Sequence, residues 1–139
     1  MPGPSTALVE SKIMTQQTRK VHIQVTWGKC TGDKWCRLDT VDLSSPVFGD
    51  GGVYVIWHGG AKPRVVYVGQ AKVIRDRLAA HRNDDRIQAY AKYGLYVTWA
   101  IVVSAHRDGV EVYLANAYEP LVGERRPTAE PITVNLPWD

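Results

Sequence analysis

The segment from Gly52 to His81 reads GVYVIWHGGAKPRVVYVGQAKVIRDRLAAH and contains the clearest secondary-structure pattern of the chain. Residues 53–57 and 64–68 are both β-branched and aromatic, which is typical of strands. The segment between them contains two glycines and a proline and therefore indicates a turn. We expect the two runs to pair as an antiparallel hairpin that ends at Gly69.

The periodicity of the residues after this hairpin predicts four more elements. These are a helix over residues 71–82, a second helix capped by Asn83 or Asp84 and ended by Gly94, a strand over 95–103, and a last helix from Gly109 to about Tyr118 that Pro120 stops. The predicted fold is α+β, a small antiparallel or mixed three-stranded sheet flanked by helices.

The first 48 residues are expected to precede this core domain, which spans residues 49–139. Residues 1–19 show no periodicity, and we interpret them as a flexible tail. Residues 21–27 alternate between apolar and polar side chains, the pattern of a half-buried strand. Residues 35–43 are its expected hairpin partner, so residues 20–48 are predicted to form an N-terminal β extension.

Composition bounds the class of protein. A chain of 139 residues fits one domain, and 45% apolar residues are typical of a soluble globular protein. No apolar run is long enough to cross a bilayer and no secretory signal is visible, which predicts a cytoplasmic protein. The gap between Cys30 and Cys36 does not match a CxxC site, so in a reducing compartment we expect two ordinary thiols.

Positive charge is concentrated in one region. The formal net charge is +3, but residues 61–92 hold eight Lys or Arg against three Asp. A local cationic face is typical of proteins that bind polyanions. The alternative interpretation of this segment is a solvated helix surface.

Four side chains around the hairpin form a pattern that suits phosphodiester chemistry. Tyr54 and Tyr67 lie on paired strands, where both hydroxyls can reach one point. Arg77 and His81 are four residues apart, hence on one side of a helix. An arginine fork binds phosphate with two hydrogen bonds and opposes the charge that develops during hydrolysis. Taken singly, each residue also has a structural interpretation, as a strand aromatic, a solvated charge or a helix-end histidine.

These motifs resemble those of the GIY-YIG nuclease family, with GVY at residues 52–54, YVG at 67–69 and the arginine and histidine on the next helix. The resemblance covers roughly residues 50–125. It implies a metal-dependent endonuclease that hydrolyses phosphodiester bonds in DNA, for repair, restriction or a mobile element, with RNA as the other possible substrate. It also implies one divalent cation, Mg²⁺ or Mn²⁺, held by a glutamate on a later helix.

Two glutamates compete for the role of metal ligand. Glu111 begins a stretch similar to the family's final helix, whereas Glu119 directly precedes Pro120, where helical geometry fails. We therefore favour Glu111, with Glu119 as the alternative. Glu111 can also be read as part of a capping box with Asp108. The family's asparagine after the proline is missing here, and Asn135 is a possible substitute in supporting the site.

The resemblance also assigns roles. Arg77 stabilises transition-state charge and Tyr54 activates water, with His81 as the rival base. The expected contacts to nucleic acid are Lys72, Arg75, Arg82 and Arg86. Two other functions stay open: a catalytically silent nucleic-acid-binding module on the same fold, and a structural partner protein that uses its five tryptophans for packing.

Overall fold

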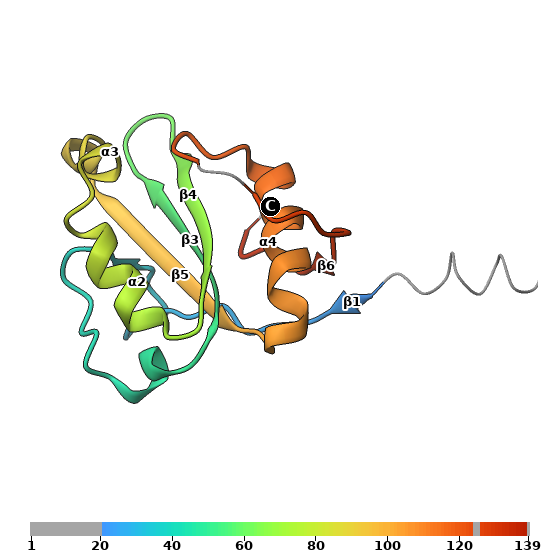
Figure 1. The fold of residues 1–139 in the computed structure, drawn as a ribbon. Coiled ribbons are helices and arrows are strands. Elements are labelled where there is room, and N and C mark those ends of the chain that lie inside the picture. The colour runs from blue at the N-terminus through green and yellow to red at the C-terminus, as the bar shows by residue number, and fades with distance from the viewer. Residues whose placement is uncertain (1–20, 124–125, 139) are drawn as a thin grey trace, which may run out of the picture.

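The computed structural model describes residues 21–123 and 126–138 and has an α+β fold (Figure 1). Its elements in chain order are β1 (His22–Ile23), β2 (Cys36–Arg37), the 3-10 turn η1 (Pro46–Gly49), β3 (Gly52–His58), β4 (Arg64–Ala71), α2 (Ile74–His81), α3 (Asp85–Gln88), the 3-10 turn η2 (Ala91–Tyr93), β5 (Leu95–Ile101), α4 (Ser104–Tyr118) and β6 (Thr133–Val134). The predicted tail at residues 1–19 lies outside the described residues.

The main sheet has four strands in the order β2-β5-β3-β4, and every pair in it is antiparallel. The predicted hairpin is confirmed as β3 and β4, in a register that places Tyr54 opposite Gly69 and Ile56 opposite Tyr67. Gly69 does not end the hairpin, because pairing continues to Ala71. β4 pairs only on its β3 side within this sheet and is therefore an edge strand.

Helices cover both faces of this sheet (Figure 1). On one face, Tyr54 and Ile56 pack with Ile74 and Leu78 of α2. On the other face, the alternate residues of β3 pack with α4, as Val53 and Val55 do with Val110 and Leu114. All seven residues of β3 are consequently buried, which explains why this strand is an unbroken apolar run.

The predicted N-terminal hairpin is wrong. β1 pairs in parallel with β6, at the far end of the chain, and β2 pairs with β5 in the main sheet. The expected alternation is nevertheless present, since Ile23, Val25 and Trp27 are half-buried while their neighbours up to Thr26 are exposed. Period-two alternation shows which side of a strand faces inward but does not identify the strand beside it.

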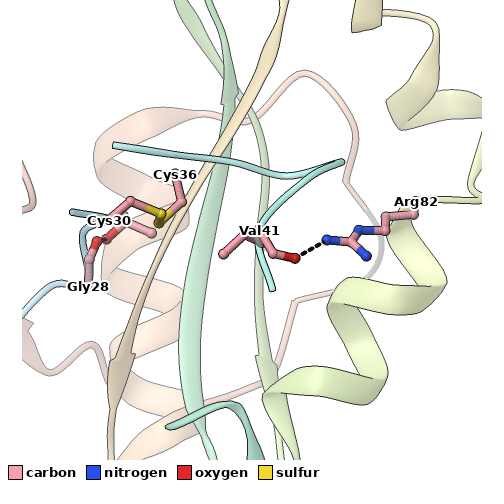
Figure 2. Close-up of a disulfide and its surroundings, with 6 residues drawn as sticks. Gly28, Cys30, Cys36, Val41 and Arg82 are labelled. Carbon is pink, nitrogen blue, oxygen red and sulfur yellow. Dashed lines mark hydrogen bonds between the residues drawn. A yellow bond between two sulfur atoms is a disulfide. The ribbon is translucent and has the colours of Figure 1, made fainter. Parts of the chain in front are cut away.

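The expectation of two free thiols is also wrong, because Cys30 and Cys36 form a disulfide (Figure 2). Gly32 and Asp33 both adopt positive φ, at 78° and 59°, and turn the chain back on itself. The amide of Cys30 then donates to the carbonyl of Lys34 at 2.7 Å. This turn brings the two cysteine Cα atoms to 5.2 Å, within the range that a disulfide spans.

The helix boundaries differ from the expected ones at α4. The Asp84 cap of the second helix is confirmed, since its side chain accepts from the Arg86 amide. The last helix, however, begins at Ser104 and has no side-chain cap, so Asp108 and Glu111 lie in its interior and the capping-box interpretation is wrong. None of the helices in the described part of the chain has the length and apolar character needed to cross a membrane.

Candidate active site at an edge strand

One guanidinium group joins the two motif tyrosines. Arg77 donates from Nε to the Tyr54 hydroxyl at 3.4 Å and from a terminal nitrogen to the Tyr67 hydroxyl at 3.3 Å. The two tyrosine rings are stacked, with centroids 6.1 Å apart. The structure therefore brings the two strand tyrosines and the helix arginine into contact, as the spacing of the motifs predicted.

His81 completes this cluster from the end of α2. Its Nε2 lies 2.6 Å from the Tyr54 hydroxyl, and only 4% of its surface is exposed. The Tyr54 oxygen already accepts from Arg77, so its own proton is available for donation to a neutral His81. Tyr54 is thus held between a cation and an imidazole.

Steric contacts explain why the two motifs contain glycine at positions 52 and 69. A Cβ on Gly69 would lie 2.4 Å from the Tyr54 hydroxyl oxygen, a distance that real Cβ atoms do not reach. A Cβ on Gly52 would lie 1.9 Å from the Ala100 carbonyl oxygen on β5. Gly69 lets the Tyr54 side chain cross over β4, and Gly52 lets β3 lie close to β5.

Burial governs the ionisation of Tyr54. Its side chain is fully buried, and this desolvation raises the pKa of its hydroxyl well above the ordinary value, although Arg77 acts in the opposite direction. Burial therefore disfavours the ionised form that Tyr54 would need to act as the base, and its role in activating water stays a prediction. The hydrogen bond from Arg77 to Tyr54 raises the arginine pKa, so Arg77 remains charged.

Glu111 reaches the same edge from the opposite face of the sheet. It lines a small cavity of about 30 Å³ that Tyr67, Val68 and Arg126 also line. Partial burial raises the pKa of the Glu111 carboxyl, while a hydrogen bond from Gln70 and the charges of Arg77 and Arg126 lower it. Arg77 on α2 and Glu111 on α4 are thus close enough to interact across β4.

The other two candidate polar residues lie elsewhere. Glu119 ends α4 in a left-handed conformation with φ 47°, and its exposed side chain follows Tyr118 at the far end of the helix. Asn135 uses both atoms of its side-chain amide on the backbone of Val25, at 2.8 and 3.0 Å. The expectation that Asn135 supports the site is therefore wrong, because it joins the two ends of the described chain.

The donor set around Glu111 fits a hard cation that takes few protein ligands. The described residues contain no group of three or more His, Cys, Asp or Glu that could hold a metal. Glu111 instead offers one half-buried carboxylate, and Asp108 lies one turn earlier on α4, where it accepts from Gln70 at 2.6 Å. Mg²⁺ accepts such a site, because it retains several waters and takes further oxygens from substrate phosphate.

Two of the predicted nucleic-acid contacts have structural partners instead. Arg75 donates to the carbonyls of Leu43 and Ser45, and Arg82 to that of Leu38. Arg82 also donates to the carbonyl of Val41 (Figure 2). These arginines attach the loop before η1 to α2, which the charge pattern alone does not reveal. Their proposed role in binding DNA is therefore revised to one of holding this loop.

The other two residues predicted to contact nucleic acid, Lys72 and Arg86, are exposed. Arg86 forms an ion pair with Asp84 at 3.1 Å. Lys72 is exposed and lines a shallow depression with Gln70 and Arg77, which places it beside the tyrosine cluster. Of the predicted cationic set, Lys72 is therefore the one that shares a surface with Arg77.

Sequence reasoning missed three residues of this site. Gln70 and Asp108 are joined by a hydrogen bond, and Arg126 lines the Glu111 cavity. Gln70 directly follows the second tyrosine motif on the edge strand, so its position was a usable signal. Arg126 comes from an irregular segment after α4, and no periodicity indicates where its side chain lies.

No protein-family model and no curated protein matches the sequence. Among solved structures, the chain is similar to point mutants of the GIY-YIG N-terminal endonuclease domain of UvrC from Thermotoga maritima, described as bound to a catalytic divalent cation. Two of them have TM-scores of 0.44 and 0.45 and identities of 16% and 18%, over 62% of this chain and 99% of that domain. These values are too low to assign the chain to that family, so any function rests on the geometry of its own residues.

Proposed function

We propose that this protein is a divalent-metal-dependent endonuclease that hydrolyses phosphodiester bonds in DNA. The observation that carries the proposal is the Arg77 guanidinium, bonded to both tyrosine hydroxyls and coupled electrostatically to Glu111 across the edge strand. A cation, a tyrosine hydroxyl and a carboxylate near one another are groups that suit phosphodiester hydrolysis.

Arg77 is proposed to bind the scissile phosphate. It remains charged, and two of its five N–H donors are accounted for by the tyrosine hydroxyls. The remaining donors form a planar fork that suits phosphate oxygens and the negative charge that grows on them in the transition state. Lys72, exposed beside Arg77, adds a second positive charge for the neighbouring phosphate.

Tyr67 is the tyrosine that we assign to the attacking water. Both tyrosines are buried, but Tyr54 has no exposed surface and a raised pKa, whereas Tyr67 lines the cavity that Glu111 reaches. The water oxygen bonds to phosphorus while the bond to the leaving sugar oxygen breaks. The Tyr67 hydroxyl orients the water, which gives up its proton to solvent, and the leaving oxygen takes one up from solvent. Tyr54 and His81 position Arg77 and do not touch the substrate.

Glu111 is proposed to hold the divalent cation. Its partial burial disfavours an uncompensated carboxylate, so a bound cation is favourable there. Mg²⁺ or Mn²⁺ would neutralise charge on the phosphate and on the leaving oxygen. Gln70 donates to Glu111 and to Asp108 and so orients both carboxylates.

The test is cleavage of single-stranded, duplex and branched DNA in Mg²⁺, in Mn²⁺ and in EDTA. We expect cleavage only with the metal, and Arg77→Ala should lower the rate by about 100-fold or more while the protein still binds DNA. Arg86→Ala is the matched control, because Arg86 pairs with Asp84 at the surface. Undiminished cutting in EDTA would contradict the metal mechanism, and binding without cutting in every metal would favour a silent module.

A further inference from the structure

A second cavity lies on the α4 side of the molecule, away from the tyrosine cluster. It has a volume of about 400 Å³, within the usual range for small-ligand sites. Its walls come from four segments: the region before β2, the β3–β4 hairpin, the end of α4 and the C-terminal segment. The residues that line it include Trp35, Trp57, Arg64, Val65, Tyr118 and Trp138.

Four aromatic residues lie in these walls. Trp138 lies 4.6 Å from Trp57, 5.2 Å from Tyr118 and 5.9 Å from Trp35, measured between ring centroids. Trp57 is largely buried, but Trp35, Tyr118 and Trp138 are only half-buried and so present ring surface to the cavity. Such walls favour a flat, polarisable ligand.

The charge of the cavity narrows the class of ligand. Among the described residues that line it, Arg64 alone carries a charge, and its side chain is exposed at the rim. An arginine at the rim disfavours an ammonium ligand and favours one with an anionic group. A nucleotide combines a flat base for the aromatic walls with a phosphate for Arg64.

The cavity is placed within reach of a strand bound at the candidate active site. Glu111 and Tyr118 are seven residues apart on α4, hence on the same side of the helix and about 10 Å apart along its axis. That length corresponds to about three base steps of a stacked strand. Val65 lines the cavity two residues before Tyr67 on β4, so the same edge strand connects the two sites.

We propose that this aromatic cavity binds an unpaired nucleobase of the DNA that the enzyme cuts, with the neighbouring phosphate on Arg64. The inference rests on the proposed nuclease function and adds a substrate class to it: DNA with an unpaired base beside the scissile phosphate. Trp138 contacts the three other rings of the cavity, so its substitution changes the aromatic lining most.

The test compares three DNA probes in EDTA, so that binding is measured without cleavage. The probes are a duplex with a three-thymidine overhang, the same duplex with an abasic overhang, and a blunt duplex. We expect the wild-type protein to bind the thymidine overhang about tenfold more tightly than the abasic one. Trp138→Leu should remove this difference and Trp138→Phe should retain most of it, while thermal unfolding confirms that both variants fold.

Arg64→Gln provides a second, independent readout. The slope of log affinity against log salt concentration for the overhang probe should fall by about one unit, which corresponds to the loss of one phosphate contact. Lys62→Gln, an exposed cation in the same hairpin that does not line the cavity, should leave the salt dependence unchanged.

The outcomes separate the two proposals. Cleavage in Mg²⁺ with no base-dependent difference in affinity overturns the cavity proposal and leaves the nuclease standing. A base-dependent difference that Trp138→Leu removes, with no cleavage in any metal, supports the cavity and overturns the nuclease. Equal binding of all three probes by wild type and Trp138→Leu, or no binding of any probe, overturns the cavity proposal.

Discussion

Among single residues, Gly69 matters to the site because it has no side chain. The Tyr54 hydroxyl occupies the space above Gly69 that a Cβ would need, and there it meets Arg77 and His81. The second motif therefore contains Tyr67, whose hydroxyl belongs to the candidate site, and Gly69, which leaves space for the side chain of Tyr54.

Gly69→Ala tests this arrangement. The new methyl group must displace the Tyr54 ring or the strand, which should cost about 1–3 kcal/mol in unfolding free energy and move Arg77 away from its position. We expect single-turnover cleavage to fall together with the urea midpoint. Gly49→Ala is the matched control, because its Cβ would meet nothing closer than 3.8 Å. A Gly69→Ala protein that cuts at the wild-type rate would refute the close approach.

Tyr54→Phe tests the burial of a protonated hydroxyl. At neutral pH the variant should lose about 1–3 kcal/mol, because His81 loses a buried hydrogen-bond partner. The raised pKa of Tyr54 stabilises the folded state below the ordinary value of 10.0, and this stabilisation is lost as the pH rises beyond it. The gap between wild type and Tyr54→Phe should therefore narrow from pH 8 to pH 11.

Urea denaturation at three pH values measures this gap. Tyr93→Phe, at an exposed position, corrects for the effect of removing a phenolic hydroxyl from the chain. If the gap stayed constant up to pH 11, the Tyr54 hydroxyl would not be held in its protonated form by burial.

Among the helices and strands, the sequence was sufficient to predict the β3–β4 hairpin. It did not predict the pairing of β1 and β2 or the start of α4. β3, β4 and α2 are local, so turn residues and periodicity determine them. The partners of β1 and β2 are far away in the chain, and alternation does not encode them. The start of α4 carries no side-chain cap, so no signal marked Ser104.

The same distinction applies to the candidate site. The spacing within Tyr54, Tyr67, Arg77 and His81 placed these residues together, because all four lie on adjacent local elements. The arginines of the basic segment looked alike in sequence, but their partners are loop carbonyls that only the tertiary fold brings near. The charge pattern therefore predicted a positively charged segment, but it did not show which arginines are hydrogen-bonded within the protein.

Arg82→Ala tests the structural role of these arginines. The change removes charged donors from the carbonyls of Leu38 and Val41, which lie at 2.8 and 2.5 Å, and should cost about 2 kcal/mol. Arg86→Ala should cost no more than about 0.5 kcal/mol, because its ion pair lies at the surface. Arg82→Ala should leave the salt dependence of DNA binding unchanged. A decrease of about one contact without loss of stability would restore the predicted DNA role.

At the scale of the whole molecule, the candidate site is a junction between the two faces of the sheet. Arg77 comes from the α2 face and Glu111 from the α4 face, and they interact across β4, an edge strand of the main sheet. The outer edge of β4 is covered at Val65 and Val66, whose carbonyls accept from the amides of Leu121 and Val122. The parallel pairing of β1 with β6 and the Asn135 contacts to Val25 pack the N-terminal segment against the α4 side. The position of Glu111 is thus a property of the assembled fold.

The most direct test of this account is single-turnover DNA cleavage in Mg²⁺ by Glu111→Gln, with Glu119→Gln as the matched control on the same helix. We expect Glu111→Gln to lose cleavage by about 100-fold or more, because the hard ligand for the cation is gone. It should not be less stable at pH 7, since the raised pKa of Glu111 means that its ionised form opposes folding above the ordinary value of 4.5. Glu119→Gln should cut at the wild-type rate. An active Glu111→Gln enzyme, or an inactive Glu119→Gln enzyme, would contradict the assignment of the site to the edge of β4.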